Sequence, residues 1–489
     1  MTDTQYGVMI YYIINHIYEK GDRRLLINYT SMGDNKMKKS SMDLTVGNIY
    51  RLIIVFALPI FVGQVFQNLY NSVDSIVVGQ FVGTTALAAV SSCSDISMLL
   101  TGFFTGLSTG AGVLFSRYFG AKQYDRLHDS IHTAVAFSLI LGVVMAALGV
   151  IFTPFLLDIV GCPEDVMAEA DAYLRVYLIG ILFTAIYNVG SGVLRAVGDS
   201  KSPFYYLIIA SITNIFADIL FVVVIPMGVV GAALATILSQ ALSVFLVFRK
   251  MMRTNDVYKL VIKDLRIQKD LLMEVIDLGI PAAIQSSLIS ISNLFVQRYI
   301  NSFGSAAMAG TGAAKKIDKF AGMVAQSIGL ATTTFVSQNY GAGKTKRAFQ
   351  GIRACLILSG ICVAVMGIPI YFFAEFFTRI FTSDETAIQY GIGMIHVMIP
   401  FYYFQALNQI YSNAVRGFGK SRAVMLLSLL GMIVLRQIWL AISMSLNKDI
   451  MNVFIGYPLG WAFSAIFVFI YYIIMIKKKF PAESRESEA

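Results

Sequence analysis

The sequence predicts an all-α membrane protein whose helices form two similar six-helix lobes. The chain of 489 residues is 57% hydrophobic and only 14% charged, whereas soluble domains are roughly a quarter charged. Its apolar residues gather in about twelve segments, each long enough for a bilayer crossing of roughly 20 residues. The second half of the chain also repeats short blocks of the first half in one constant register.

The apolar segments define the expected helices in chain order. Each has the length that a tilted transmembrane helix needs. In the first half they lie near residues 49–78, 86–116, 130–153, 169–195, 203–226 and 229–249. In the second half they lie near 271–301, 307–338, 350–374, 387–415, 423–446 and 451–476.

These segments divide the chain into five parts. We predict an atypical N-terminal extension, a first lobe, a basic linker, a second lobe and a polar tail, at residues 1–36, 37–250, 251–270, 271–479 and 480–489. The apolar run of the extension is too short to span a bilayer. Two interpretations of the extension stay open: a start assigned too far upstream, with Met37 or Met42 as the true first residue, or an interfacial helix.

Basic residues predict the side of the membrane that each loop faces. They gather on one side, near residues 117–126, 195–201, 249–269, 344–347, 416–422 and 477–479. The loops on the opposite side hold mostly acids, among them Asp158, Asp165 and Glu385. Because Lys and Arg are enriched in cytoplasmic loops, we expect a cell-membrane protein with both termini and the linker in the cytoplasm.

Three sequence blocks recur at one spacing. The blocks GTTALA at 83–88, SRYFGA at 116–121 and RAVGDS at 195–200 return as GSAAMA at 304–309, SQNYGA at 337–342 and RGFGKS at 416–421. In all three pairs the two blocks are separated by the same number of residues along the chain, the number from Gly83 to Gly304. We call this separation the repeat offset. One shared register indicates an internal duplication. Because each copy has an even number of spans, both enter from the same side, so the lobes are predicted to be parallel repeats related by an axis along the membrane normal.

Composition also argues against several function classes. The four cysteines have no CxxC spacing and the four histidines form no metal-ligand motif. The net charge of +9 is explained by basic cytoplasmic loops, so we expect no nucleic-acid partner. No set of His, Asp or Cys marks an active site at a membrane interface, so an enzyme ranks last. We expect no cofactor and no metal.

The chain resembles the multidrug and toxic compound extrusion (MATE) family over roughly residues 42–479. The resemblance is carried by Pro59 with Gln64, NLYNSVD at 68–74, Val78-Gly79, the block at 83–90, RAVGDSKSP at 195–203 and NIFAD at 214–218. It implies two lobes in a V shape around a cleft, cation-coupled drug efflux by alternating access, and a first helix that bends at Pro59.

Intramembrane carboxylates are the strongest functional candidates, because a charge inside the bilayer is costly. Asp218 and Thr236 lie eight residues on either side of the turn at 226–228, at matching depth on neighbouring helices. Asp74 and Asn214 lie in the same outer half of the first lobe, so we expect all four side chains to converge. Two carboxylates with amide and hydroxyl oxygens suit a small cation or shared protons. These positions match the cation-coupling residues of the family.

Other polar residues of the spans are weaker candidates. Asn188 on the fourth span is added to the coupling group, although it lies nearer the cytoplasm. Interhelical hydrogen bonding is the plainer explanation for such residues. It explains the two acids less well, because at the repeat offset Asp74 and Asp218 become Phe295 and Trp439. Packing of the repeat therefore does not require them.

The first helix also carries candidates for the substrate cleft. Gln64, Gln67 and Asn71 share one helical face with Asp74. Tyr70 and Tyr187 offer aromatic faces that attract organic cations. The two glutamines, the asparagine and the two tyrosines are the predicted substrate contacts.

A charge pair between the lobes is a separate hypothesis. Asp95 on the second span and Lys316 on the eighth are separated by the repeat offset, so they are repeat mates. Mates near a pseudo-twofold axis can touch, and each charge alone would be costly in the membrane. The alternatives are that each charge lies in a water-filled cleft, that Lys316 pairs locally with Asp318, or that Lys316 extends outward to the membrane surface.

The sequence thus predicts a secondary active antiporter that works as a monomer among membrane lipids. It would export amphipathic organic cations in exchange for H⁺ or Na⁺. The alternative is a flippase for lipid-linked precursors from the same superfamily, which would need a more cationic cleft.

Overall fold

The computed structural model describes residues 41–479, which lie within one compact unit. The predicted extension at 1–36 and the tail at 480–489 lie outside these residues. The described part is helical, and it contains no β-strand.

The first half contains six long helical spans and one short helix. They are α2 (Ile49–Phe81), α3 (Thr84–Gly120), α4 (Tyr124–Ile151), the short α5 (Thr153–Ile159), α6 (Met167–Ala196), α7 (Lys201–Asp218) with the π-helix η3 (Ile219–Val224), and α8 (Gly228–Arg253). The side chain of Asn48 caps α2 by accepting a hydrogen bond from the backbone N–H of Arg51. Gly83, with φ at +129°, forms the turn into α3.

The second half repeats this order after the linker, which contains the short 3₁₀ helix η4 (Ile262–Asp264). Its elements are α9 (Lys269–Asn301), α10 (Ser305–Gly341), α11 (Thr345–Phe372), the short α12 (Ala374–Arg379), α13 (Glu385–Met398), η5 (Ile399–Phe401), α14 (Tyr402–Gly417), α15 (Ser421–Leu429), η6 (Leu430–Leu435), α16 (Arg436–Leu446) and α17 (Ile450–Lys479).

The predicted spans agree with the helices to within several residues, with two differences. Eleven helical spans of the described chain are long and apolar enough to cross a membrane as single pieces. The tenth span is instead broken into α13 and α14 by the 3₁₀ turn η5, because Pro400 has no backbone N–H to donate. The short helices α5 and α12, whose first residues are repeat mates, were not predicted.

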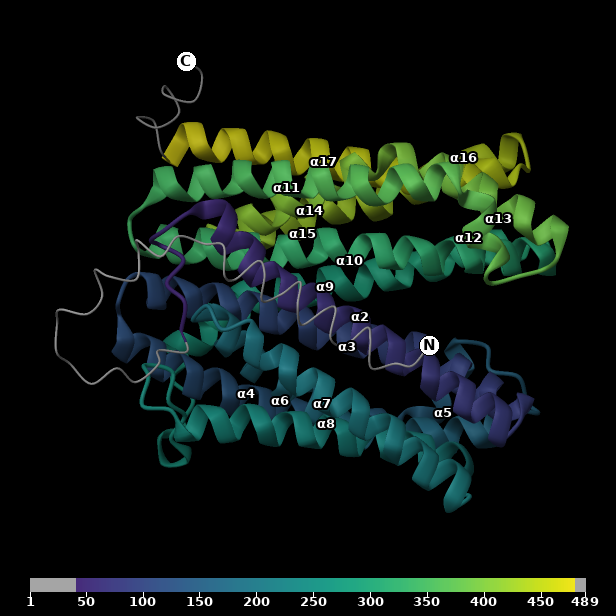
Figure 1. Ribbon diagram of the computed structural model, residues 1–489, viewed down its shortest axis with the longest axis horizontal. Coiled ribbons are helices and arrows are strands. Elements are labelled where there is room, and N and C mark those ends of the chain that lie inside the picture. Colours follow the sequence, from purple (N-terminus) through teal and green to yellow (C-terminus); the bar gives the residue numbers. More distant parts are fainter. Residues whose placement is uncertain (1–40, 480–489) are drawn as a thin grey trace, which may run out of the picture. The chain divides into compact units, whose positions relative to one another are not determined.

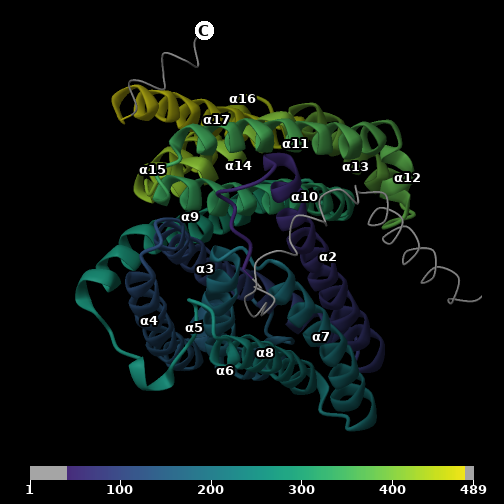
Figure 2. The same ribbon diagram turned by 60° about the vertical axis from the view of Figure 1, so that its left-hand side comes forward.

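Helix α2 packs into both halves of the protein. Near its start, Ile53 and Phe56 lie in a hydrophobic core with Phe335 of the second half. Near its end, Val77 and Val78 lie in a core built from the first half. Figures 1 and 2 show α2 crossing from one helical bundle to the other.

Helix α9, the repeat mate of α2, makes the reciprocal crossing. Leu271 and Val275 near its start belong to a core of the first half, together with Leu127. Val296 and Ile300 near its end belong to a core of the second half. The two halves therefore exchange the starts of their first helices, which ties them together at one end.

Glycines allow close backbone contact at the joined end. A Cβ atom on Gly120 would lie 2.0 Å from the carbonyl oxygen of Gln338, and one on its repeat mate Gly341 would lie 2.1 Å from that of Arg117. Further along α3, a Cβ on Gly110 would lie 2.3 Å from the Cα of Gly279 on α9. These distances exclude any larger residue without a shift of the backbone.

Polar contacts reinforce the same end. The Gln338 amide donates to the carbonyl oxygen of Ala196 at 2.7 Å and accepts from the Leu44 N–H at 2.9 Å. Arg117 forms an ion pair with Glu274 on α9 at 3.1 Å. At the other end of the bundles the ribbons of the two halves are separated (Figure 1).

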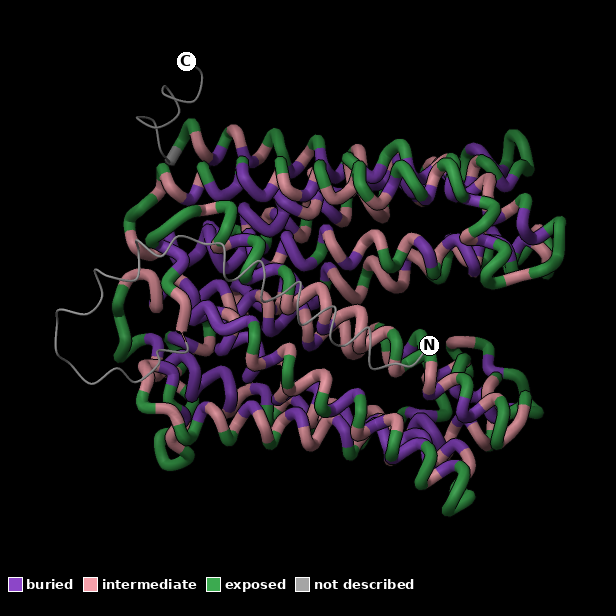
Figure 3. Tube along the Cα trace, in the orientation of Figure 1, coloured by how far each residue is buried: buried purple, intermediate pink, exposed green. Residues whose placement is uncertain are grey.

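The outward faces of the peripheral helices are apolar. On α4 the exposed residues include Leu139, Ile140 and Val143, and on α11 they include Ile361 and Val365. Helix α10, by contrast, is the most deeply buried of the membrane-length helices, and buried residues gather where the halves meet (Figure 3). Exposed apolar faces on membrane-length helices are the surfaces that lipid covers.

The close contact between α3 and α9 gives a testable prediction. We expect Gly110→Ala to lower the melting temperature of the purified protein, because the new methyl group meets backbone atoms of Gly279 and Leu278. Overpacking of this kind costs about 1–3 kcal/mol. The control is Gly312→Ala on α10, where no atom lies within 4 Å of the added Cβ and alanine favours the helix. Equal melting temperatures for both variants would contradict the assigned contact.

Candidate functional site

The predicted site centres on three buried polar residues of α2 and α7. Asp74 is 8% exposed, and Asn214 and Asp218 are 0% exposed. Within the described chain, both carboxylate oxygens of Asp218, both side-chain polar atoms of Asn214 and Oδ1 of Asp74 lack a hydrogen-bond partner. Buried polar groups are normally paired, so this concentration of unpaired polar atoms makes the place the strongest candidate for a ligand site.

The two carboxylates act on each other electrostatically. The negative charge of Asp74 acts on Asp218, and the charges of both carboxylates act on the Tyr173 hydroxyl of α6. Two like charges in a buried place repel each other unless a proton or a cation lies between them. The arrangement can therefore take up protons or hold a small cation through hard oxygen ligands.

The local helix geometry places these side chains together. Asn214 and Asp218 are four residues apart on α7, so they share one face. Asp218 is the last residue before the π-helix η3. A π-turn inside a helix often marks a functional site, and here it follows directly on the carboxylate.

The other two predicted coupling residues, Thr236 and Asn188, have different surroundings from the carboxylates. Thr236 is buried on α8, which packs along α7. Among the described residues, its hydroxyl makes no hydrogen bond to either carboxylate. The Asn188 amide donates to the Thr184 carbonyl oxygen at 2.9 Å and accepts from the Thr105 hydroxyl at 3.3 Å. Asn188 thus joins α6 to α3, and the described contacts do not bring it to the carboxylates.

Several tyrosines lie near Asp74. The Tyr70 hydroxyl lies near the Gln67 side chain and within electrostatic range of Asp74. The Tyr173 and Tyr177 rings stack with centroids 6.1 Å apart. Sequence reasoning missed these two residues, although their spacing of four on one helix was a usable signal.

The remaining predicted cleft residues lie on α2. Gln64 accepts a hydrogen bond from Ser327 of α10 at 3.4 Å, so it faces the other half. Asn71 is exposed, and the Tyr187 hydroxyl donates to the Pro203 carbonyl oxygen at 3.4 Å. Pro59 lies inside α2, between Phe56 and Ile60, which both pack against the core of the second half. Its bending stays a prediction.

The proposed pair between Asp95 and Lys316 is not formed. The Lys316 ammonium group lies over the Phe381 ring at 5.3 Å, within the second half. Asp95 instead feels the charge of Lys315, the neighbouring residue on α10. One residue is a rotation of about 100° around a helix, so the repeat mate points away from the partner that the duplication suggested.

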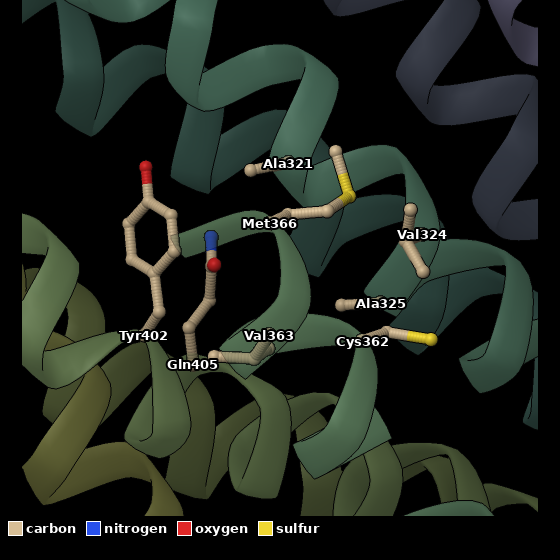
Figure 4. Close-up of a pocket in the computed structure, with 8 residues that line it drawn as sticks. All are labelled: Ala321, Val324, Ala325, Cys362, Val363, Met366, Tyr402 and Gln405. Atoms are coloured by element: carbon tan, nitrogen blue, oxygen red, sulfur yellow. The ribbon is translucent and has the colours of Figure 1, made fainter. Parts of the chain in front are cut away.

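Lys315 belongs to a polar cluster of the second half that the sequence reasoning missed. Asp318 accepts a hydrogen bond from the Tyr402 hydroxyl at 2.6 Å, and Lys315 feels the charges of Asp318 and Arg436. Tyr402 also lines a small pocket between α10, α11 and α14, together with Gln405 and others (Figure 4). The rule that intramembrane charges are functional candidates would have found this cluster.

A group of possible metal ligands lies outside this region. His128, His132 and Asp264 have ligand atoms within 4.8 Å of one another, which the sequence spacing did not suggest. Nδ1 of His132 is 2.7 Å from the His128 carbonyl oxygen, and Nε2 accepts from the Val261 N–H at 3.0 Å. Both ring nitrogens of His132 are thus engaged, and the group ties the linker to α4. We assign no metal to it.

A duplicated set of membrane-length helices, with two unpaired carboxylates, Asp74 and Asp218, buried in the first half, is the architecture of a polytopic membrane transporter. The family model described as MatE matches residues 59–220 and again 281–441, so each half matches it once. The chain belongs to the MATE family, the multidrug and toxic compound extrusion transporters.

Relatives and solved structures agree with this assignment. The chain is 31% identical over 445 residues to the probable multidrug resistance protein YoeA of Bacillus subtilis (strain 168), covering 88% of this chain and 95% of the relative. It is 21% identical over 382 residues to the multidrug export protein MepA of Staphylococcus aureus (strain N315), covering 78% and 84%. A solved structure described as the outward-facing conformation of a multidrug resistance MATE family transporter has the same fold, with a TM-score of 0.83, 23% identity and coverage of 91% and 99%.

The unpaired carboxylates predict that removing one of them should stabilise the fold, even where it impairs function. We expect Asp218→Asn to raise the melting temperature at pH 8 by an amount equivalent to about 1–3 kcal/mol, because a buried, unpaired charge beside Asp74 is removed. The gain should shrink as the pH falls, since protonation neutralises the same carboxylate in the unmodified protein. Asp95→Asn, at an exposed acid, is the control and should change little. A lower melting temperature for Asp218→Asn at every pH would argue that this carboxylate serves packing instead.

Proposed function

We propose that this protein is a secondary active antiporter that exports amphipathic organic cations in exchange for H⁺ or Na⁺. One observation carries the proposal: two buried carboxylates, Asp74 and Asp218, lie close together without hydrogen-bond partners at three of their four oxygens. Their absence from the duplicate positions supports a role in coupling rather than in packing. The names of the relatives, which refer to multidrug resistance and export, support the substrate class.

Orientation follows from the same sequence pattern that predicted it. The joined end of the halves carries Arg117, Lys344 and Arg347. By the enrichment of basic residues on the cytoplasmic side, this end faces the cytoplasm of the cell membrane. The separated end then opens to the outside, and export ends there by release of the substrate. We propose that one chain performs this cycle alone.

Coupling is tested by transport in proteoliposomes that hold the purified full chain. The probe is ethidium, driven by an imposed gradient of H⁺ in one arm and of Na⁺ in the other. We expect Asp74→Asn and Asp218→Asn to reduce gradient-driven transport at least tenfold, because each variant keeps only one of the two carboxylates that would share the proton or cation. Asn214→Ala and Thr236→Ala should reduce it less, since each removes only one neutral ligand.

The control for transport is Asp158→Asn, which removes an exposed acid on α5 and should leave the rate unchanged. Activity in either arm identifies the coupling ion. Full transport by Asp218→Asn, or no ethidium movement under either gradient, would refute the proposal.

A further inference from the structure

The second half carries charges of opposite sign near the place that corresponds to the carboxylate site. At the repeat offset, Asp74, Asp218 and Thr236 correspond to Phe295, Trp439 and Tyr457. The Arg436 guanidinium lies over the Tyr457 ring at 5.6 Å. The duplicate of the acidic site has thus exchanged its carboxylates for aromatic rings and a buried cation.

Arg436 is a buried cation without an acidic partner. Its residue is only 3% exposed, and one terminal nitrogen donates to the Ser292 hydroxyl at 2.6 Å. Its Nε has no hydrogen-bond partner. No Asp or Glu of the described chain lies within ion-pair distance of the guanidinium. A buried charge is normally paired, and the described residues leave Arg436 without an anion.

Lys315 adds a second cation to the same place. It donates to the Gln297 side chain of α9 and feels the charges of Arg436 and Asp318. Asp318 is also engaged by the Tyr402 hydroxyl. Within the described second half, these two cations therefore face one acid, Asp318.

Asp95 is the other acid that Lys315 feels, and it lies on α3 of the first half. It forms no ion pair within 4.0 Å among the described residues. Asp95 is exposed and Lys315 is partly exposed, so an incoming molecule can approach Lys315 from this side. Tyr457 and Trp461, whose rings lie 6.4 Å apart, supply apolar surface beside the charges.

We propose that Arg436 and Lys315 form a binding site for the oxyanion, a carboxylate or a phosphate, of a transported amphiphile. The guanidinium offers a planar set of donors that matches an oxyanion, and the ammonium group adds a compact charge. The site deepens the proposed function, on which it rests, by extending the substrate class to amphiphiles that carry an acidic group. The first lobe then handles the coupling cation while the second lobe holds the anionic end of the substrate.

The tryptophans of the chain make this site directly observable. The sequence has two tryptophans, and both lie beside the cluster. Trp461 packs on Tyr402 with ring centroids 5.8 Å apart, and Trp439 lies three residues after Arg436. Tryptophan fluorescence of the purified full chain in phosphatidylcholine nanodiscs is therefore measured while octanoate is added. Octylammonium, with the same alkyl chain and the opposite charge, is added in a parallel series.

We expect a saturable fluorescence change with octanoate. Octylammonium belongs to the cationic substrate class proposed above, so any response to it should not depend on Arg436 or Lys315. Arg436→Gln and Lys315→Gln should each weaken octanoate binding at least tenfold, as expected for loss of a charged hydrogen bond. Lys316→Gln is the matched control, because Lys316 lies over Phe381, and its affinity should be unchanged. Lys315 is less buried than Arg436, so its variant gives the answer if Arg436→Gln fails to fold.

Unchanged octanoate affinity in Lys315→Gln would overturn the proposal, as would an equal loss of octanoate and octylammonium binding in that variant. Binding is measured without an ion gradient, so it is independent of coupling. Asp218→Asn should bind octanoate normally while it fails to export ethidium. If that variant exports ethidium normally, the coupling proposal fails. The octanoate measurements then still test the anion site independently.

Discussion

The exchange of the starts of α2 and α9 between the halves is the constraint on which the rest of the structure depends. Each lobe completes its core at the joined end only by taking in the first helix of the other lobe. Glycines then bring the backbones of α3, α9 and α10 into direct contact. The halves are therefore fixed to each other at one end, and any change in their separation must be absorbed along α2 and α9. Pro59 and Pro281 lie in those two helices.

The duplication gives the two lobes one architecture and different chemistry. In the first lobe, burial acts on carboxylates that have no partner, and repulsion between them favours uptake of a positive charge. In the second lobe, burial acts on a guanidinium without an acidic partner. Helix packing tolerates carboxylates in one place and a guanidinium in the other, because corresponding helices of the two halves enclose the two places. Sequence divergence after duplication has thus given residues of opposite charge to two places that began as equivalents.

Much of the fold could be predicted from sequence, because hydrophobic length and repeat spacing are properties of the chain itself. Predicting the break at Pro400 required the local effect of its missing N–H to be considered. Helices α5 and α12 are too short to give a hydropathy signal. For the site, helical spacing placed Asn214 and Asp218 on one face and depth placed Asp74 beside them. Contacts between helices were harder to predict. Lys315 rather than Lys316 faces Asp95 because a one-residue difference rotates a side chain by about 100°, and the role of Asn188 depends on which neighbour α6 packs against.

The crossing of α2 also has a consequence for how the protein is made. Ile53 and Phe56 leave the ribosome early, yet their packing partners include Phe335, Val415 and Tyr472, which are synthesised much later, with the second half of the chain. Contacts of such long sequence separation form slowly, and domains otherwise assemble in the order of synthesis. The first helix to be inserted into the membrane is therefore among the last to reach its final neighbours. Until the second lobe is complete, half of α2 has only lipid or a membrane chaperone to cover it.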